Sequence, residues 1–177
     1  YLSKEARKML DEAGYNEAFS QLGENINNTR VRFHKIAPFE PFDIEDYHII
    51  PLAADHDSNS GPVIYIIEKG EKSLLYANDT GIFPDSTWDY IEKYNKKFDL
   101  ISLDCTGMAL KHYRSSHLGL NTDKEVYDRL TEIGVCDYNT VVYVNLFSHN
   151  GQLTHEELVI EATKYGFLAT YDGLEVI

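Results

Sequence analysis

Apolar residues along most of the chain follow the patterns of β-strands. A strand pattern covers residues 31–36 (VRFHKI) and 47–53 (YHIIPLA). A β-hairpin is predicted by the runs VIYIIE and SLLYA, because they flank the polar tetrapeptide KGEK. Continuous apolar runs at 99–104 (DLISLD) and 140–147 (TVVYVNLF) are typical of buried strands. The runs FLATYD and LEVI, on either side of Asp172-Gly173, predict a closing pair of strands.

Helical periodicity and capping residues separate several of these strands. Residues 3–13 place apolar side chains on one helical face. Capping boxes that begin at Ser86 and Thr122 predict helices to about residues 94 and 133. The best-formed box has Thr154 at the N-cap, and Gly166 is expected to end its helix. Strands that alternate with helices indicate the α/β class, and 177 residues suit a single domain.

The charge and the apolar content exclude several classes of protein. The formal net charge is -13, and the absence of a Lys/Arg-rich run argues against a nucleic-acid-binding surface. The sequence contains no apolar run near the roughly 20 residues that span a bilayer, and it opens without a signal-peptide pattern. Its two cysteines, Cys105 and Cys136, form no disulfide framework, so we expect a cytoplasmic protein.

Polar groups that could bind a metal ion follow four of the predicted strands. The four stretches are Asp55-His56-Asp57, Asn78-Asp79-Thr80-Gly81, Asp104-Cys105-Thr106-Gly107 and Ser148-His149-Asn150-Gly151. Loops at strand ends converge in α/β proteins, and histidine and carboxylate groups suit divalent metal ions. Any one stretch is equally explained as a turn, because Asp, Asn and Gly are common turn residues. Four such stretches together favour a metal site.

The order DHD…G…YIIE…LLYANDTG…W…FDLISLDCTG…HLGL…FSHNG.LTHEEL…YDGLEV resembles the metallo-β-lactamase superfamily. Within it, the chain is most similar to the branch that resembles phosphoribosyl cyclic phosphate phosphodiesterase. The resemblance covers about residues 47–177. It implies an α/β fold that is part of a four-layer αββα sandwich, with a dinuclear metal site at its edge.

The resemblance also implies roles for individual residues. His56 matches a metal-binding histidine, and Asp79 matches the aspartate that bridges two metal ions. His117 matches a histidine that acts as a general acid or contacts phosphate. His149 lies in the last segment of metal ligands, and Asp172 lies in the closing turn. The cofactor expected from these residues is one or two divalent ions, Zn or Mn, with Fe as a further choice.

Two features depart from the pattern of the superfamily. The HxHxDH motif, which supplies most metal ligands in the superfamily, does not occur in this sequence. We therefore expect residues 1–177 to be a single domain that corresponds to the C-terminal portion of the fold. Leu146 occupies a position where relatives carry a histidine ligand. Either His149 replaces that ligand, or one ion is bound weakly or is absent.

Three hypotheses of function follow from the sequence. The first is a metal-dependent hydrolase of the phosphodiesterase type, in which a metal-activated hydroxide attacks the substrate. The second is a degenerate, non-catalytic relative that binds a nucleotide or a protein partner. The third is a generic α/β domain whose resemblance misleads. The expected partner is a small phosphodiester or nucleotide-like substrate, with neither nucleic acid nor membrane as a partner, and a homodimer remains open.

Overall fold

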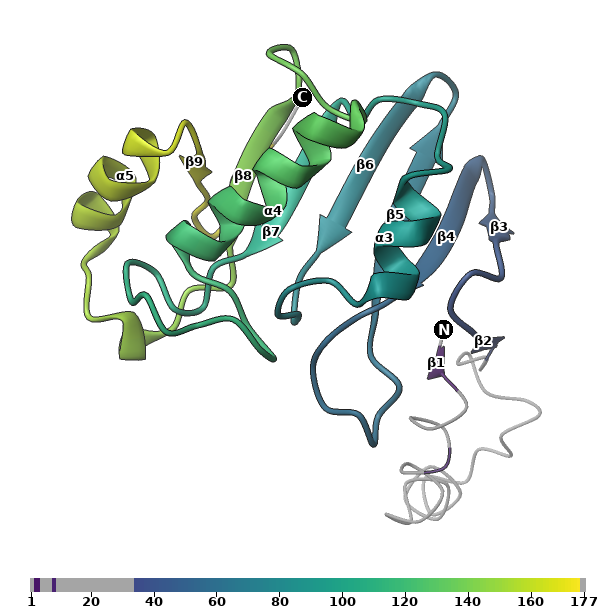
Figure 1. Cartoon of the computed structure of the whole chain (residues 1–177), viewed down its shortest axis with the longest axis horizontal. Helices are drawn as coiled ribbons and strands as arrows, with labels where there is room; N and C mark the ends of the chain where they lie inside the picture. Colours follow the sequence, from purple (N-terminus) through teal and green to yellow (C-terminus); the bar gives the residue numbers. More distant parts are fainter. Residues whose placement is uncertain (1, 4–7, 9–33, 176–177) are drawn as a thin grey trace.

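A seven-stranded mixed sheet organises the part of the chain that the computed structural model describes, which is residues 2–3, 8 and 34–175 (Figure 1). Its strands lie side by side in the order of the sequence. They are β3 (Phe42–Ile44), β4 (Tyr47–Ala53), β5 (Val63–Lys69), β6 (Lys72–Ala77), β7 (Leu100–Asp104), β8 (Val141–Asn145) and β9 (Leu168–Ala169). Neighbours from β3 to β6 are antiparallel, and neighbours from β6 to β9 are parallel. The predicted β-hairpin is β5–β6.

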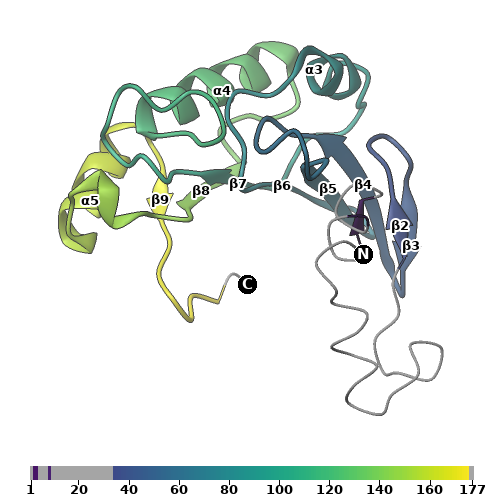
Figure 2. The same ribbon diagram turned by 90° about the horizontal axis from the view of Figure 1, so that it is seen from below.

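The other elements lie around this sheet. The helices are α3 (Asp85–Ile91), α4 (Leu120–Ile133) and α5 (His155–Lys164), with a short 3-10 helix, η2 (His149–Gly151). A separate parallel pair joins β1 (Leu2–Ser3) to β2 (Lys35–Ile36). Figure 2 shows α3 and α4 on one face of the sheet, and α5 beside β9 at its end. Ser3, the first residue of the predicted helix at 3–13, belongs to β1, and apart from residue 8 the rest of that helix lies outside the described residues, as do residues 31–33 of the strand at 31–36.

The core lies between the sheet and the helices α3 and α4. Alternate residues of the central strands point to this face, and they are fully buried. The largest buried side chains include Trp88, Phe98, Ile64, Ile66, Leu75, Ile101 and Leu103. The parallel strands connect through helices, which is the usual form of the crossover between parallel neighbours in one sheet. The predicted α/β class is confirmed.

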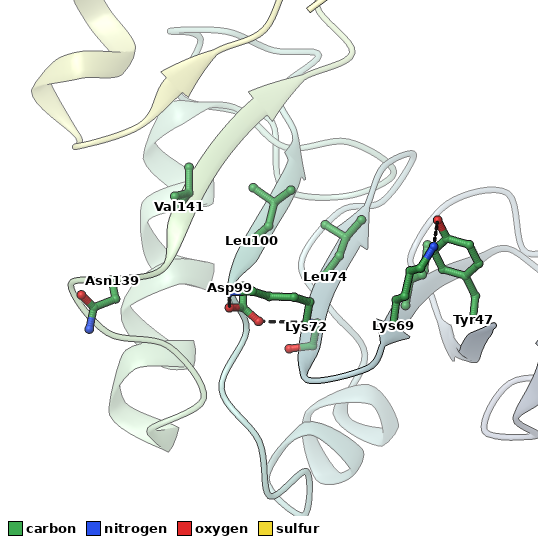
Figure 3. A pocket seen from close by; sticks show the side chains of 10 residues that line it. Tyr47, Lys69, Lys72, Leu74, Asp99, Leu100, Asn139 and Val141 are labelled. Carbon is green, nitrogen blue, oxygen red and sulfur yellow. Dashed lines mark hydrogen bonds and ion pairs between the residues drawn. The ribbon is translucent and has the colours of Figure 1, made fainter. Parts of the chain in front are cut away.

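The opposite face of the sheet also carries apolar side chains. Leu74, Leu100 and Val141 are neighbours across β6, β7 and β8, and all three are partly or fully exposed. With Ile67 they line a pocket of about 580 Å³, and Lys72 lies at its edge in an ion pair with Asp99 (Figure 3). Apolar residues on both faces are typical of a sheet that is packed on both sides.

Two predicted N-caps are wrong. Helix α3 has Pro84 at its N-cap rather than Ser86, and it ends at Ile91. Proline fixes φ near the helical value and lacks the N–H group, so it favours an earlier start. Helix α4 has Gly119 at its N-cap rather than Thr122. Thr122 therefore lies inside the first turn, where its hydroxyl accepts a hydrogen bond from the Gly119 N–H at 3.0 Å.

The predicted start of α5 is confirmed. Thr154 is the N-cap, and its hydroxyl accepts a hydrogen bond from the Glu157 N–H at 3.3 Å. The Glu157 carboxylate accepts one in return from the Thr154 N–H at 2.9 Å. Gly166 follows the helix with φ of 82°, a left-handed conformation that glycine adopts at low cost. None of the helices of the described residues is long and apolar enough to cross a membrane.

The predicted pairing of FLATYD with LEVI is wrong for the described residues. Leu168 and Ala169 form β9, which pairs in parallel with β8. The chain then turns, with a hydrogen bond from the Leu174 N–H to the Tyr171 carbonyl at 3.0 Å. The edge of the parallel sheet offers β9 a partner, so a hairpin at Asp172 is not needed. Residues 176–177 lie outside the described residues.

Candidate metal centre

Three loops meet at the edge of the sheet where β4, β6 and β7 end. The loop after β4 carries His56, the loop after β6 carries Asp79, and the loop between β7 and α4 carries His117. Strands β4, β6 and β7 all run in the same direction, because β5 is antiparallel to both of its neighbours. Their carboxyl ends therefore share one edge, which brings residues that are distant in sequence together.

His56, Asp79 and His117 form a compact group of metal-binding side chains. The His56 Nε2 atom lies 3.5 Å from Asp79 Oδ1, and His117 Nδ1 lies 4.0 Å from the same oxygen. The two imidazole rings meet edge to face, with centroids 4.9 Å apart. One ligand atom from each residue lies within 4.8 Å of the others. Within the described part of the chain, this is the one group of three or more such residues that could hold a metal ion.

A buried carboxylate fixes the orientation of His117. The Oδ2 atom of Asp104 lies 2.8 Å from His117 Nδ1, and Asp104 is 0% exposed. Asp104 also accepts hydrogen bonds from the backbone N–H groups of Thr106 at 2.9 Å and Leu118 at 3.3 Å. These N–H groups offset part of the cost of burying the charge. The sequence placed Asp104 among the polar strand ends, but it gave no sign that Asp104 is the partner of His117.

His56 is held by the backbone of its own loop. The Asp57 N–H donates a hydrogen bond to His56 Nδ1 at 2.8 Å, which leaves Nε2 facing Asp79. The carboxylate of Asp57 accepts hydrogen bonds from the backbone and side chain of Asn59, so it closes a turn. The carboxylate of Asp55 faces the Ser116 N–H at 3.4 Å. The stretch is therefore a turn and a source of one site residue at the same time.

Asp79 occupies a backbone conformation that few residues adopt. Its φ is 51°, and its side chain is 59% exposed. Aspartate tolerates the left-handed region better than most residues, because its short side chain can hydrogen-bond locally. Unusual backbone conformations gather at functional sites. The exposed carboxylate is open to solvent and to an incoming ion.

Gly81 allows the three loops to approach closely. Its N–H donates to the Asp55 carbonyl at 2.7 Å, and the next N–H, of Ile82, donates to the Arg114 carbonyl at 2.8 Å. A Cβ atom on Gly81 would lie 2.5 Å from the Arg114 carbonyl oxygen and 2.5 Å from Asp55 Oδ2. The absence of a side chain at position 81 is therefore what permits the loops of His56, Asp79 and His117 to meet.

The remaining predicted residues lie outside this group. His149 is the first residue of η2, and it is exposed. It is not among the residues whose ligand atoms converge, so its role as a ligand stays a prediction. Asp172 lies in the exposed turn after β9. Leu146 follows β8 with φ of 60° and is 40% exposed. Its carbonyl accepts a hydrogen bond from the Thr106 hydroxyl at 3.0 Å, which places its backbone beside the site.

Cys105 has the environment of a structural thiol. It is 0% exposed, and burial raises its pKa well above the usual value for cysteine. Its contact with the Asp123 carboxyl group, and the nearby Asp104, raise the pKa of Cys105 further. Because the thiolate is the nucleophilic form, this environment disfavours a reactive cysteine.

The group of His56, Asp79 and His117 fits a divalent transition-metal ion. It offers imidazole nitrogen and carboxylate oxygen, which Zn, Mn and Fe bind. Catalytic zinc sites typically use three protein ligands and leave one position for water, so this group can supply two or all three of the protein ligands. The exposure of Asp79 leaves such a position accessible from solvent.

The chain is similar to one known family of protein domains and to many solved structures. Residues 7–135 match the family described as the beta-lactamase superfamily domain. A search of curated proteins finds no match. Because the matched structures are distant in sequence, their likeness concerns the fold.

Three of these structures show the extent of the likeness. The metallo-beta-lactamase fold protein YhfI from Bacillus subtilis has a TM-score of 0.58 and 15% identity, over 87% of this chain and 57% of that protein. A possible metal-dependent hydrolase from Veillonella parvula has a TM-score of 0.59 and 11% identity, over 91% and 62%. The metallo hydrolase Igni18 from Ignicoccus hospitalis has a TM-score of 0.54 and 15% identity, over 89% and 69%.

The extent of these matches fits the layers described above. The chain spans 57% of the length of YhfI, and its sheet with α3 and α4 accounts for two layers of the predicted four. The family match covers 129 residues (7 to 135 inclusive), which is more than half of the 177. The chain therefore belongs to the β-lactamase superfamily and has the metallo-β-lactamase fold.

Proposed function

We propose that the protein is a metal-dependent hydrolase that cleaves a phosphodiester. The observation that carries this proposal is the convergence of His56, Asp79 and His117 within 4.8 Å at the edge of the sheet. The family match supports the proposal, because this fold occurs in neighbours described as metal-dependent hydrolases. The choice of a phosphodiester as the substrate rests on the sequence resemblance to one branch of the superfamily.

In this proposal, His56 and Asp79 hold the metal ion. His56 would bind through Nε2, the atom that faces Asp79, once Nδ1 takes up the ring proton and gives up the hydrogen bond from the Asp57 N–H. Asp79 would bind through its exposed carboxylate. Zn, Mn or Fe at this position would lower the pKa of a bound water and so supply a hydroxide nucleophile near neutral pH. His149 is a further candidate ligand from the neighbouring loop.

His117 serves as the proton donor to the leaving group. Its Nδ1 atom is engaged by the buried Asp104, which leaves Nε2 as the nitrogen that can carry the transferred proton. Phosphodiester cleavage expels an oxygen that needs a proton, and imidazole can donate one near neutral pH.

A small phosphodiester, such as a nucleotide-like compound, is the substrate in this proposal. The net charge of -13 disfavours a long polyanion such as nucleic acid. The two cysteines are free and buried, which is compatible with the proposed cytoplasmic location. Assembly as a homodimer belongs to the same proposal.

Metal content measured by elemental analysis tests the metal site. The purified protein is loaded with Zn or Mn and dialysed, and it is compared with His56→Ala and Asp79→Asn. His48→Ala is a matched control, because His48 also pairs with an aspartate, Asp43 Oδ1 at 2.7 Å, but it lies on β4 away from the site. We expect bound metal in the wild type and the control, and its loss in both site variants.

Two results would contradict the proposal. Metal that is absent from the wild type, or unchanged in His56→Ala and Asp79→Asn, would show that these loops are turns without a metal role. A wild type that binds metal but does not hydrolyse bis(p-nitrophenyl) phosphate or a panel of cyclic phosphodiesters would support the non-catalytic, ligand-binding alternative.

A further inference from the structure

A threonine hydroxyl lies between His117 and the end of β8. The Thr106 Oγ1 atom is 3.1 Å from His117 Nδ1 and 3.0 Å from the carbonyl oxygen of Leu146. The two contacts reach segments that are 11 and 40 residues away in sequence. Thr106 therefore joins the loop of the proposed proton donor to the loop that follows β8.

The direction of these hydrogen bonds follows from the atoms involved. A carbonyl oxygen can only accept, so the single proton of the Thr106 hydroxyl goes to Leu146. The hydroxyl then presents only lone pairs to His117 Nδ1, which must carry a proton to make the contact. The carboxylate of Asp104, at 2.8 Å from the same nitrogen, accepts backbone N–H groups and is here also an acceptor. Two independent acceptors thus place a proton on His117 Nδ1.

The backbone around Thr106 is fixed on both sides. The Thr106 N–H donates to Asp104 Oδ1 at 2.9 Å, so the same carboxylate anchors Thr106 and His117. The neighbouring Cys105 N–H donates to the Asn145 carbonyl at 2.8 Å. These two backbone hydrogen bonds fix Thr106 at the end of β7, and its hydroxyl contacts Leu146 from that fixed position.

The hydrogen bond to Leu146 helps to hold an unfavourable backbone conformation. Leu146 has φ of 60°, which most residues other than glycine avoid. Such a conformation persists where the surroundings determine it. The hydrogen bond from Thr106 to the Leu146 carbonyl is one of the contacts that hold it. The position of the loop after β8 is thereby tied to the position of the His117 ring.

From these contacts we infer that Thr106 is a positioning residue, which holds His117 in the tautomer with a proton on Nδ1 and fixes its ring against the end of β8. Nε2 is then the atom that exchanges a proton with substrate. The tautomer rests on geometry alone, whereas its catalytic consequence rests on the proposed function.

Thr106→Val tests this inference, because valine has nearly the shape of threonine without the hydroxyl. Thr106→Ser keeps the hydroxyl. Thr140→Val is the matched control, since the Thr140 hydroxyl also donates to a carbonyl, of Phe98 at 2.8 Å, and accepts an N–H, from Asp137 at 3.1 Å, at the far end of the strands. The readouts are the ¹⁵N chemical shifts of the His117 imidazole, the metal content, and kcat for bis(p-nitrophenyl) phosphate.

We expect Thr106→Val to shift the His117 nitrogen signals and to lower kcat by about tenfold, the effect of one lost hydrogen bond, without loss of metal. Thr106→Ser restores both readouts, and Thr140→Val leaves both at wild-type values. His117 signals in Thr106→Val that equal those of the wild type would overturn the inference. A wild type without hydrolytic activity would contradict the proposed function, but the nitrogen signals would still decide the role of Thr106.

Discussion

The Oδ2 atom of Asp104 lies 2.8 Å from His117 Nδ1, and Asp104 is completely buried. Asp104 is the last residue of β7, and His117 precedes α4, so the loop between them folds back over the end of its own strand. A charge in such a place is tolerated because four N–H groups surround it, from Thr80, Thr106, Leu118 and the His117 ring. The proposed proton donor is therefore a partly exposed loop residue whose ring is anchored to a buried carboxylate.

Asp104→Asn should lower both the activity that depends on His117 and the stability of the fold. The asparagine amide has one acceptor oxygen and one NH2 donor group, so its NH2 group must oppose an N–H group that Asp104 accepts. We expect the free energy of unfolding to fall by about 1–3 kcal/mol and hydrolysis to fall by about 100-fold or more. Urea unfolding and kcat for bis(p-nitrophenyl) phosphate measure the two effects.

Asp99→Asn is the control for this prediction. Asp99 lies at the other end of the same strand, where it accepts a hydrogen bond from the Ser73 N–H at 2.9 Å. The hydrogen bond from Lys72 holds the pKa of Asp99 below its usual range. Asp99→Asn should alter stability without altering kcat per folded molecule. Equal losses of kcat in both variants would count against a special role for Asp104.

Gly81→Ala should separate the loops that form the candidate metal centre. The new Cβ would lie 2.5 Å from a backbone carbonyl oxygen that cannot easily move, the one of Arg114. We expect at least a tenfold loss of metal affinity, by titration calorimetry, together with a destabilisation of about 1–3 kcal/mol. In Gly70→Ala, by contrast, no atom lies within 4 Å of the new Cβ, and only its φ of 57° is unfavourable. That variant should lose about 1 kcal/mol of stability and keep its metal affinity.

Asp123 makes stability depend on pH. It is fully buried on α4, and burial raises its pKa well above 3.8, helped by the charge of Asp104. The folded state therefore keeps this proton at pH values where the unfolded chain has released it, so the free energy of unfolding falls as pH rises above about 3.8. The fall from this one group is about 1.4 kcal/mol for each pH unit until the folded-state pKa is reached.

Asp123→Asn should remove this dependence, because an amide does not titrate. We expect the variant to match the wild type below about pH 4 and to exceed it by about 1 kcal/mol or more near pH 7. Urea unfolding at several pH values measures the difference. An Asp123→Asn curve that runs parallel to the wild type at every pH would show that Asp123 is ionised in the folded protein.

The sequence predicted the positions of most strands, but it did not predict every helix start or strand pairing. The period-two and continuous apolar patterns predicted β4 with its observed bounds and β5 to β8 closely, because each of these strands buries a full side-chain row. The N-caps at Ser86 and Thr122 failed, because several residues near each helix start can cap and only the tertiary structure selects one. The strand at FLATYD was found as β9, but its predicted pairing with LEVI failed, because the true partner, β8, is remote in sequence.

The sequence identified His56, Asp79 and His117 one by one, but not their contacts. Their convergence depends on the shared edge of β4, β6 and β7, and on the close packing at Gly81. Asp104 carried a recognisable signal as a carboxylate at the end of an apolar strand, yet its burial and its partner depend on how the following loop folds back. Thr106 lay in one of the four polar stretches, but nothing in the sequence indicated its contact with His117, because a threonine after a strand is most often an ordinary turn residue.

Leu146→His should strengthen metal binding. Leucine cannot bind a metal ion, and the resemblance to the superfamily implies a histidine ligand at this position. The backbone is favourable, since histidine occupies the left-handed region more often than leucine does, and φ here is 60°. Because Leu146 is 40% exposed, its loss removes little buried apolar surface. We expect at least a tenfold gain in affinity for Zn or Mn, or a second bound equivalent, by titration calorimetry and elemental analysis.

Leu146→Asn supplies the control, because asparagine relieves the backbone equally but brings no imidazole. The same gain in both variants would attribute the effect to the backbone, and no gain in either would place residue 146 outside the ligand shell.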